Sequence, residues 1–502
     1  MTEAAAIAPK TMFMREPPHP AITPSQEAAI PRWIAEGPAA LADIRTAAFN
    51  ALKKTGLPHT GSEDFSFIRV GEFLPHLGPP AAAANPATGA IAPTAGRLPT
   101  QADIQGQLVA EARGSYLVLV DGTYVPELSK PGNGFQVSTL SRETLPADLR
   151  ASLVRVAAEE TDAVAALGMV FSRDPLVIQV AAKAVPAEPL LLLHFHTGSG
   201  VRSDAFILYH GGKLSEARVL ARHASLADSA TPPGAVATGS MENVHTVALL
   251  DDGASLKFLE AGAGAQSAGA QTGTAGSGEN TVNRDIHFRK LTARLHRDSR
   301  LLAISAHTGS RLTRNSFSVD LAGEGAEAEV DGATVLTGNR QSHNFVRIRH
   351  LVPHCVSRQH FKSVAADQSR SSVDGTIYVA KDAQQTNAYQ LINNLMLSDE
   401  ARADSKPQLM IHADDVKCSH GATSGKLDPA QQFYLESRGL PPLQARALLT
   451  VAFIAEVLEK AGKSGEAGAT PGSDGFRDIL DHALLDTLKN RLPAASEGER
   501  HA

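Results

Sequence analysis

Residues 301–338 read LLAISAHTGSRLTRNSFSVDLAGEGAEAEVDGATVLTG, in which short apolar runs alternate with turn residues. Runs of this length, rich in Val, Ile and Leu and bounded by Gly and Asp, are typical of β-strands. The same texture extends from about 172 to 418, in runs such as PLLLLHFHTG (189–198) and PQLMIHADDV (407–416). We therefore predict that this part of the chain is a long series of strands and that the protein is mainly β.

The connections between these strands narrow the choice of fold. Few of the runs are separated by an amphipathic helix of ten or more residues, which argues against a doubly wound sheet in which helices and parallel strands alternate. Many short strands suit a sandwich, a closed barrel or a solenoid. The runs are often apolar on both faces of the strand, and polar residues gather at 338–344 (GNRQSHN). These features favour a solenoid.

Three low-complexity stretches divide the chain. They are rich in Pro, Ala, Gly and Ser. We interpret 78–99 as a solvated linker, 261–280 as a loop insertion and 461–475 as a flexible tether. We expect an N-terminal helical region at 1–77 and a connecting α/β region at 100–171. A strand core at 172–427 and a C-terminal helical region at 428–502 are expected to follow.

Helix signals are clear at both ends of the chain. Residues 38–54 carry apolar side chains at helical spacing, and Gly56 ends that pattern. Near the C-terminus, Asp428 is a good N-cap followed by Pro429, and a second helix is expected to begin near Pro442. A third helix is expected at about 473–492. Beyond a flexible tether, it would bury its apolar stripe against this chain or against a partner.

In the second of these helices, Leu448, Val451 and Ile454 lie on one stripe. We expect this stripe either to bind a partner or to pack inside the protein.

Composition limits the function. The chain has 502 residues, of which 43% are apolar and 20% charged, and its net charge is −6, which gives no global attraction to nucleic acid or to anionic lipid. Two cysteines, Cys355 and Cys418, do not make a disulfide framework. The first residues, MTEAAAIAPKTMFMREPPHP, lack a basic segment followed by an apolar one. We expect a cytoplasmic protein with protein partners, without nucleic acid or membrane binding.

Searches for catalytic motifs give no candidate. The phosphate-binding loop G-x-x-x-x-G-K-[ST], H-E-x-x-H and C-x-x-C do not occur. The stretch Gly421–Gly425 fits a nucleophile elbow with Thr423 in place of Ser, but its later triad partner would have to be His482 or His501, in the tail. We predict that the chain has no catalytic residues and is not an enzyme.

One candidate metal site stands out, in KCSHGATSGKLD (417–428). On a strand, Cys418 and His420 would share a face, roughly 6.6 Å apart along the chain. Thiolate and imidazole together suit iron, zinc or an iron–sulfur species. The alternative for Cys418 is a place in the core, because free cysteine is among the most buried residue types. A pair does not complete the coordination of a metal, so further ligands would come from elsewhere in the chain or from another subunit.

Longer stretches of the sequence resemble a known protein family. AQQTNAYQLINNLMLSDEARADSKPQLMIHADDVKCSHGATSGKLDPAQQFYLESRGLPPLQAR (383–446) resembles the SufB/SufD family of the bacterial SUF iron–sulfur cluster assembly system. Upstream, HFRKLTARLHRDSRL (287–301) and the stretch at 344–383 fit the same family. SufB typically has Ser-His-Glu-Ala where this chain has Ser-His-Gly-Ala (419–422), together with a Glu-Gly-Cys motif that is absent here. The resemblance is therefore to the SufD branch.

The resemblance implies a right-handed parallel β-helix flanked by N- and C-terminal helical regions. It implies pairing with a SufB-like subunit through the β-helix, with His420 and Cys418 near a nascent cluster or iron at that interface. It also implies that a SufC-like ATPase binds the C-terminal helices, where Leu448, Val451 and Ile454 are the candidate contacts. Whether a flavin joins the complex, and whether the isolated chain carries iron, is left open.

The expected function is thus a scaffold subunit that supports cluster assembly and iron entry. One alternative is a homodimeric scaffold like SufB that acts without a SufB partner. The other is a carbohydrate-active β-helix enzyme of the pectate-lyase kind, which would need a catalytic cleft and usually export.

Overall fold

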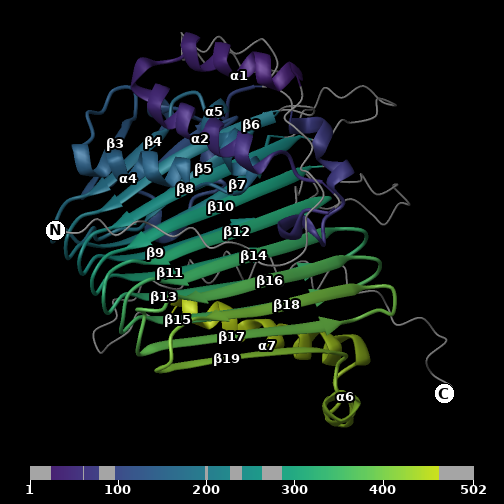
Figure 1. The fold of residues 1–502 in the computed structure, drawn as a ribbon. Helices are drawn as coiled ribbons and strands as arrows, with labels where there is room; N and C mark the ends of the chain where they lie inside the picture. Colours follow the sequence, from purple (N-terminus) through teal and green to yellow (C-terminus); the bar gives the residue numbers. More distant parts are fainter. Residues whose placement is uncertain are drawn as a thin grey trace.

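The structure is a computed structural model that describes residues 24–59, 61–77, 97–197, 202–226, 240–262 and 285–462. From β4 onward, successive strands alternate between two stacked sheets (Figure 1). The first sheet contains β1 (Tyr116–Val120), β2 (Thr123–Tyr124), β5 (Leu190–His196), β7 (Glu216–Ser225), β9 (Ser255–Gly262), β11 (Arg300–His307), β13 (Glu327–Leu336), β15 (Val356–Ala365), β17 (Thr386–Met396) and β19 (Val416–Gly425). The second contains β3 (Phe135–Thr139), β4 (Leu176–Val180), β6 (Arg202–Gly211), β8 (Met241–Leu250), β10 (Ile286–Leu295), β12 (Leu312–Leu321), β14 (Gln341–His350), β16 (Arg370–Val379) and β18 (Arg402–Ile411).

Pairing within each sheet is parallel, apart from the antiparallel pairs β1–β2 and β3–β4. In the middle of the second sheet, Asn315 of β12 lies beside Asn344 of β14, 29 residues later in the chain. One coil of about this length therefore adds one strand to each sheet. The prediction of a mainly β protein with a parallel β-helix-like core and helices at both ends is confirmed. The right-handed sense of the coil stays a prediction.

Most strands before β17 are covered on both faces, which explains why their runs are apolar on both faces. In β5, Leu190 and Leu192 point between the sheets into the main hydrophobic core, whereas Leu191 and Leu193 point outward into a second cluster. Alternate residues of a strand point to opposite sides. A strand buried on both sides therefore loses the apolar–polar alternation of a half-exposed one.

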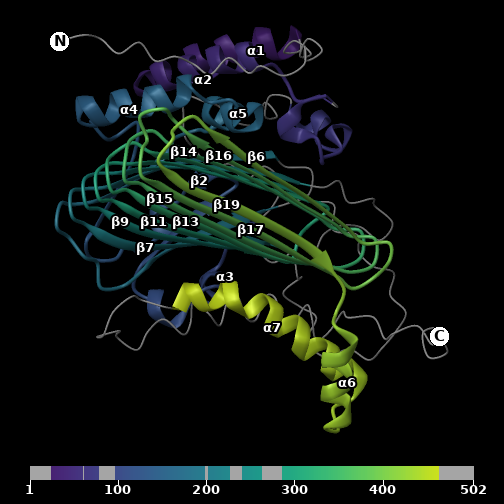
Figure 2. The same ribbon diagram turned by 60° about the horizontal axis from the view of Figure 1, so that its bottom comes forward.

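Helices pack on part of each outer face (Figure 2). On the second sheet lie α1 (Pro24–Glu36), α2 (Ala42–Thr55), α4 (Ala147–Ala158) and α5 (Ala163–Phe171), and their apolar residues share a core cluster with Phe206, Val247 and Phe288. The first sheet is covered by α3 (Gln101–Gln105) and α7 (Pro442–Gly462), the latter preceded by α6 (Pro429–Ser437). Short 3-10 helices lie at Ala39–Leu41, Glu63–Phe65, Val70–Glu72, Leu74–Leu77, Ala110–Ala112 and Pro126–Leu128.

Local helix signals agree with the structure. The Asp428 carboxylate accepts a hydrogen bond of 2.8 Å from the Ala430 amide, with Pro429 at the first position of α6. Gly56 ends α2 with a positive φ of 73°. The sheets, however, begin earlier than the expected boundary at 172, because β1 and β3 belong to them.

Some expected features lie outside the described residues. These are the linker up to residue 96, the loop insertion from 263, the tether and the helix expected at 473–492. Of the helices that the structure describes, none combines the length and the apolar character needed to span a membrane.

Candidate functional site

The last coil of the solenoid, formed by β17, β18 and β19, ends the two sheets (Figure 1). We call this coil the open end. Within the described residues, β19 pairs only with β17, and β18 pairs only with β16. Most side chains of β18 and β19 are exposed or half-buried, in contrast to the buried strands before them. An edge of this kind presents free backbone donors and acceptors to another chain.

Cys418 and His420 both lie on β19. Cys418 aligns with Ala388 of β17 and His420 with Gln390, and both of these neighbours are buried on the inner side of the coil. Cys418 and His420 therefore face the solenoid interior at its open end, with Cys418 half-buried and His420 exposed. The structure brings the two residues onto one face, as the strand spacing predicts.

Metal binding by Cys418 and His420 depends on whether the Cys418 thiol carries its proton. Burial raises the pKa of the Cys418 thiol above its ordinary value, so the sulfur carries a proton at neutral pH in the free chain. Only the thiolate binds metals, so binding a metal here would release that proton. In the part of the chain that the structure describes, Cys418 and His420 belong to no group of three metal-ligating side chains.

Other histidines near the last strands have structural partners. His343 Nδ1 lies 2.7 Å from Ser372 Oγ, His350 Nε2 lies 2.8 Å from Ser357 Oγ, and His360 Nε2 lies 3.2 Å from Asn393 Oδ1. Burial lowers the pKa of His350 to about 4, so this ring is neutral at physiological pH. These contacts fit a structural role inside the fold.

The stripe on α7 is divided between the core and the surface. Ile454 is 2% exposed and packs with Val364 and other residues of the first sheet, and Val451 packs half-buried against the same cluster. Leu448 is 48% exposed. The large apolar side chains exposed on α6 and α7 are therefore Phe433 and Tyr434 of α6 and Leu443 and Leu448 of α7.

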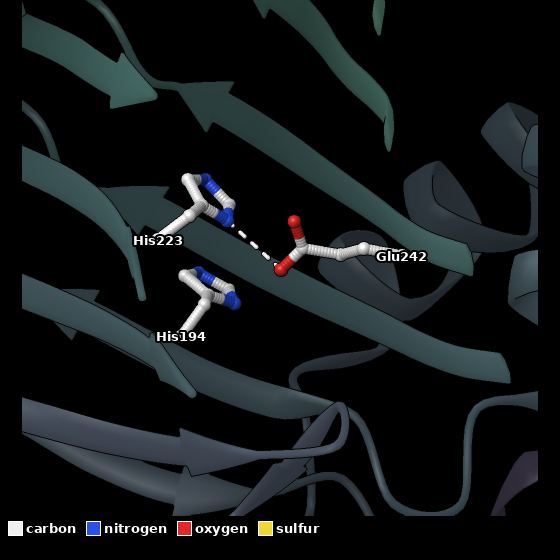
Figure 3. A group of neighbouring side chains, drawn as sticks. All are labelled: His194, His223 and Glu242. Carbon is white, nitrogen blue, oxygen red and sulfur yellow. Dashed lines mark hydrogen bonds and ion pairs between the residues drawn. The ribbon is translucent and has the colours of Figure 1, made fainter. Parts of the chain in front are cut away.

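A second group of side chains was not anticipated from the sequence. His194 of β5, His223 of β7 and Glu242 of β8 lie together in the solenoid interior, with their ligand atoms within 4.8 Å of one another. We call these three residues the interior cluster. Figure 3 shows the two imidazoles side by side next to the Glu242 carboxylate. All three side chains are buried, and the two rings are stacked with centroids 4.6 Å apart.

The Glu242 carboxylate is surrounded by imidazoles. Oε1 lies 2.8 Å from His223 Nδ1 and 3.2 Å from His196 Nε2, and Oε2 lies 2.9 Å from His287 Nδ1. Burial alone would raise the pKa of Glu242, but His223 and His196 hold it well below its ordinary value. The carboxylate is therefore ionised. Burial lowers the pKa of His194 to about 3, so that ring is neutral.

One signal for this cluster is present in the sequence. The run LLLLHFH (190–196) places His194 and His196 on one face of an otherwise apolar strand. The positions of His223 and Glu242 follow only from the register of the neighbouring coils, which local sequence does not reveal.

Comparisons with known proteins agree with this architecture. A family profile described as "SUF system FeS cluster assembly, SufBD core domain" matches residues 235–453. The iron–sulfur cluster assembly protein SufD of Escherichia coli is 31% identical over 390 residues, covering 76% of this chain and 80% of that protein. A SufBD family protein of Synechocystis is 38% identical over 166 residues, or 33% of this chain and 36% of its own. SufD of Bacillus subtilis is 39% identical over 97 residues, which cover 19% of this chain and 22% of that protein. These matches confirm the resemblance, and the chain belongs to the SufBD family of iron–sulfur cluster assembly proteins as a SufD-type subunit.

Proposed function

We propose that the chain is a scaffold subunit that pairs with a SufB-like subunit through its open end, and that clusters are assembled at this junction. The observation that carries the proposal is the half-complete ligand pair on β19. Cys418 and His420 offer one sulfur and one nitrogen, and within the described residues this chain brings no third ligand to them. An iron ion or a nascent cluster, as the cargo of the system, would take its other ligands from the partner.

The backbone of the open end supports pairing. A second chain that adds a strand beside β19 would satisfy its outer row of amides and carbonyls. In β18, Pro407 supplies no backbone N–H. Proline is tolerated in a sheet mainly on edge strands, where it removes one donor from the exposed row. We therefore place the stronger backbone contact at β19.

The second partner in the proposal is a SufC-like ATPase, bound to α6 and the first turns of α7. Phe433 is 71% exposed and Tyr434 57% exposed on a short helix that projects from the solenoid (Figure 2). Two neighbouring aromatic side chains at this exposure suit a protein contact. The ATPase would supply the nucleotide-binding loop that this sequence lacks.

The test compares three variants of one strand. His420→Ala should reduce the activity of cluster-dependent enzymes in cells to the level of a strain without this protein, while the complex with the SufB-like and SufC-like subunits still forms. One imidazole contributes little beside the burial of a whole interface. Cys418→Ala removes the sulfur ligand and should also reduce cluster delivery, whereas unchanged delivery would show that the thiol only fills space beside Ala388.

Ser419→Ala is the matched control, because Ser419 lies between the two residues and faces the opposite side of β19. It should leave cluster delivery unchanged. Full cluster delivery by His420→Ala, with complex formation measured in the same cells, would refute a role for this imidazole near the metal.

A further inference from the structure

The interior cluster has the donor set of a transition-metal site. Two imidazoles and one carboxylate come from three different strands and meet between the two sheets. Imidazole nitrogen suits first-row metals such as iron, zinc and nickel, and two histidines with one carboxylate are the usual ligands of non-haem Fe(II). None of the three is a thiol, so this donor set differs from that of the open end.

His194 gives an independent reason to expect a ligand. Its side chain is buried, and neither ring nitrogen has a hydrogen-bond partner among the described residues. Buried polar groups without partners are rare, because each costs free energy that a partner would recover.

The hydrogen bonds of His223 fit a metal ligand. Its Nδ1 faces Glu242 at 2.8 Å, and its Nε2 faces Glu260 at 2.9 Å. A neutral imidazole has one N–H, so it donates to only one of these carboxylates. With a metal at Nδ1, the proton stays on Nε2 and is donated to Glu260. Metal-bound histidines commonly donate their other N–H to a carboxylate in this way.

The charges around the cluster are consistent with a cation. Glu242 and Glu260 are both buried, and Arg289 is a basic neighbour of both. Its Nε lies 3.4 Å from Glu260 Oε1, and its Nη2 lies 3.8 Å from Glu242 Oε2. Arg289 also bonds to His307 Nδ1 at 2.8 Å. Arg289 brings one positive charge to these two carboxylates, and a divalent ion bound by Glu242 would add positive charge beside the second.

We infer that His194, His223 and Glu242 bind one first-row divalent metal ion, of the Fe(II) or Zn(II) class, inside the solenoid. This site is separate from Cys418 and His420 and does not need a partner subunit. It would let the isolated chain hold an ion before any interface forms.

The test uses the full chain, without a histidine tag, stripped with a chelator and titrated with Co²⁺ under anaerobic conditions. We expect each chain to bind one Co²⁺. Visible absorption would monitor the titration, and the metal content after gel filtration would give the number of ions bound. Bound Co²⁺ should also raise the melting temperature, because a ligand that binds only the folded state stabilises it.

His194→Leu is the decisive variant. Since neither nitrogen of His194 has a partner within the described chain, leucine removes a ligand without leaving another group unpaired. The variant should fold with a melting temperature at least equal to that of the metal-free protein, and should bind Co²⁺ at least tenfold more weakly. His343→Gln, at a buried histidine bonded to Ser372, and His420→Ala, at the open end, should both bind Co²⁺ like the original chain.

Three outcomes would overturn the inference. They are a wild-type chain that takes up less than one Co²⁺, a His194→Leu variant that binds as tightly as the wild type, and loss of binding in His420→Ala. The last would move the ion to the open end. These outcomes are measured as metal binding by the isolated chain, whereas the proposed function is tested by cluster delivery in cells, so each test can fail without the other.

Discussion

His350 shows how single buried histidines couple the fold to pH. The ring lies in the core at the end of β14, and burial lowers its pKa to about 4. In the unfolded chain its pKa returns to roughly 6.5, so unfolding takes up a proton between these two values. The resulting stability is complete above about pH 6.5 and is lost as the pH falls towards 4. The difference corresponds to roughly 3 kcal/mol.

We therefore predict that His350→Gln flattens the acid side of the stability profile. The glutamine amide can still donate to Ser357 Oγ, but it does not take up a proton when the chain unfolds. The loss of unfolding free energy between pH 6.5 and pH 4.5, measured by urea denaturation, should be smaller in the variant than in the wild type. Equal losses in both proteins would show that His350 does not contribute to acid unfolding.

At the scale of elements, α7 has an inner and an outer face. Ile454 packs on the first sheet, and Lys460 on the same helix bonds to Glu329 at 2.8 Å and to Asp331 at 2.9 Å. Burial raises the pKa of Asp331 to about 7, despite its contact with Lys460. Leu448, by contrast, is exposed. The helix is thus held to the solenoid by one face, and the other remains accessible.

Because α7 has these two faces, one substitution in it should affect partner binding and another should affect stability. Leu448→Asp should weaken binding of a SufC-like ATPase at least tenfold, with less than about 0.5 kcal/mol change in stability, as is usual for surface positions. Ile454→Asp buries an unpaired charge and should cost more than about 3 kcal/mol or release the helix. Calorimetric titration and thermal melts would measure both. Unchanged ATPase binding by Leu448→Asp would remove this surface from the proposed interface.

Elements also show what local sequence predicts and what it does not. The starts of the C-terminal helices follow from Asp428, Pro429 and Pro442, because capping involves neighbouring residues. Strand pairing depends on the length of each coil, and this length varies: Gln341 aligns with Arg370, but Arg370 aligns with Arg402. The pair on β19 is visible in the sequence since its residues are two apart. The interior cluster spans separate coils, so its assembly appears only in the structure.

At the scale of the whole molecule, the two ends of the solenoid differ. The first coils are closed by the antiparallel pairs β1–β2 and β3–β4, whereas β18 and β19 end their sheets within the described residues. Each coil of a solenoid contacts only its neighbours, so a terminal coil without a cap leaves its core exposed. A partner stacked on the open end would extend the interior and bury the inner face of β19.

The inner face of β19 supplies the test. Ala422 is exposed and aligns with buried Ile392, so a stacked partner would enclose it, whereas Thr423 points to the outer side. Ala422→Glu would place an unpaired charge in the new interior, at a cost of several kcal/mol. We predict that Ala422→Glu abolishes pairing with a SufB-like subunit and that Thr423→Glu, the control, does not. Light scattering after gel filtration would measure this, on the chain alone and with the partner. A dimer of the chain alone that Ala422→Glu disrupts would favour the homodimeric scaffold. Pairing that survives Ala422→Glu would mean that the open end is not the interface.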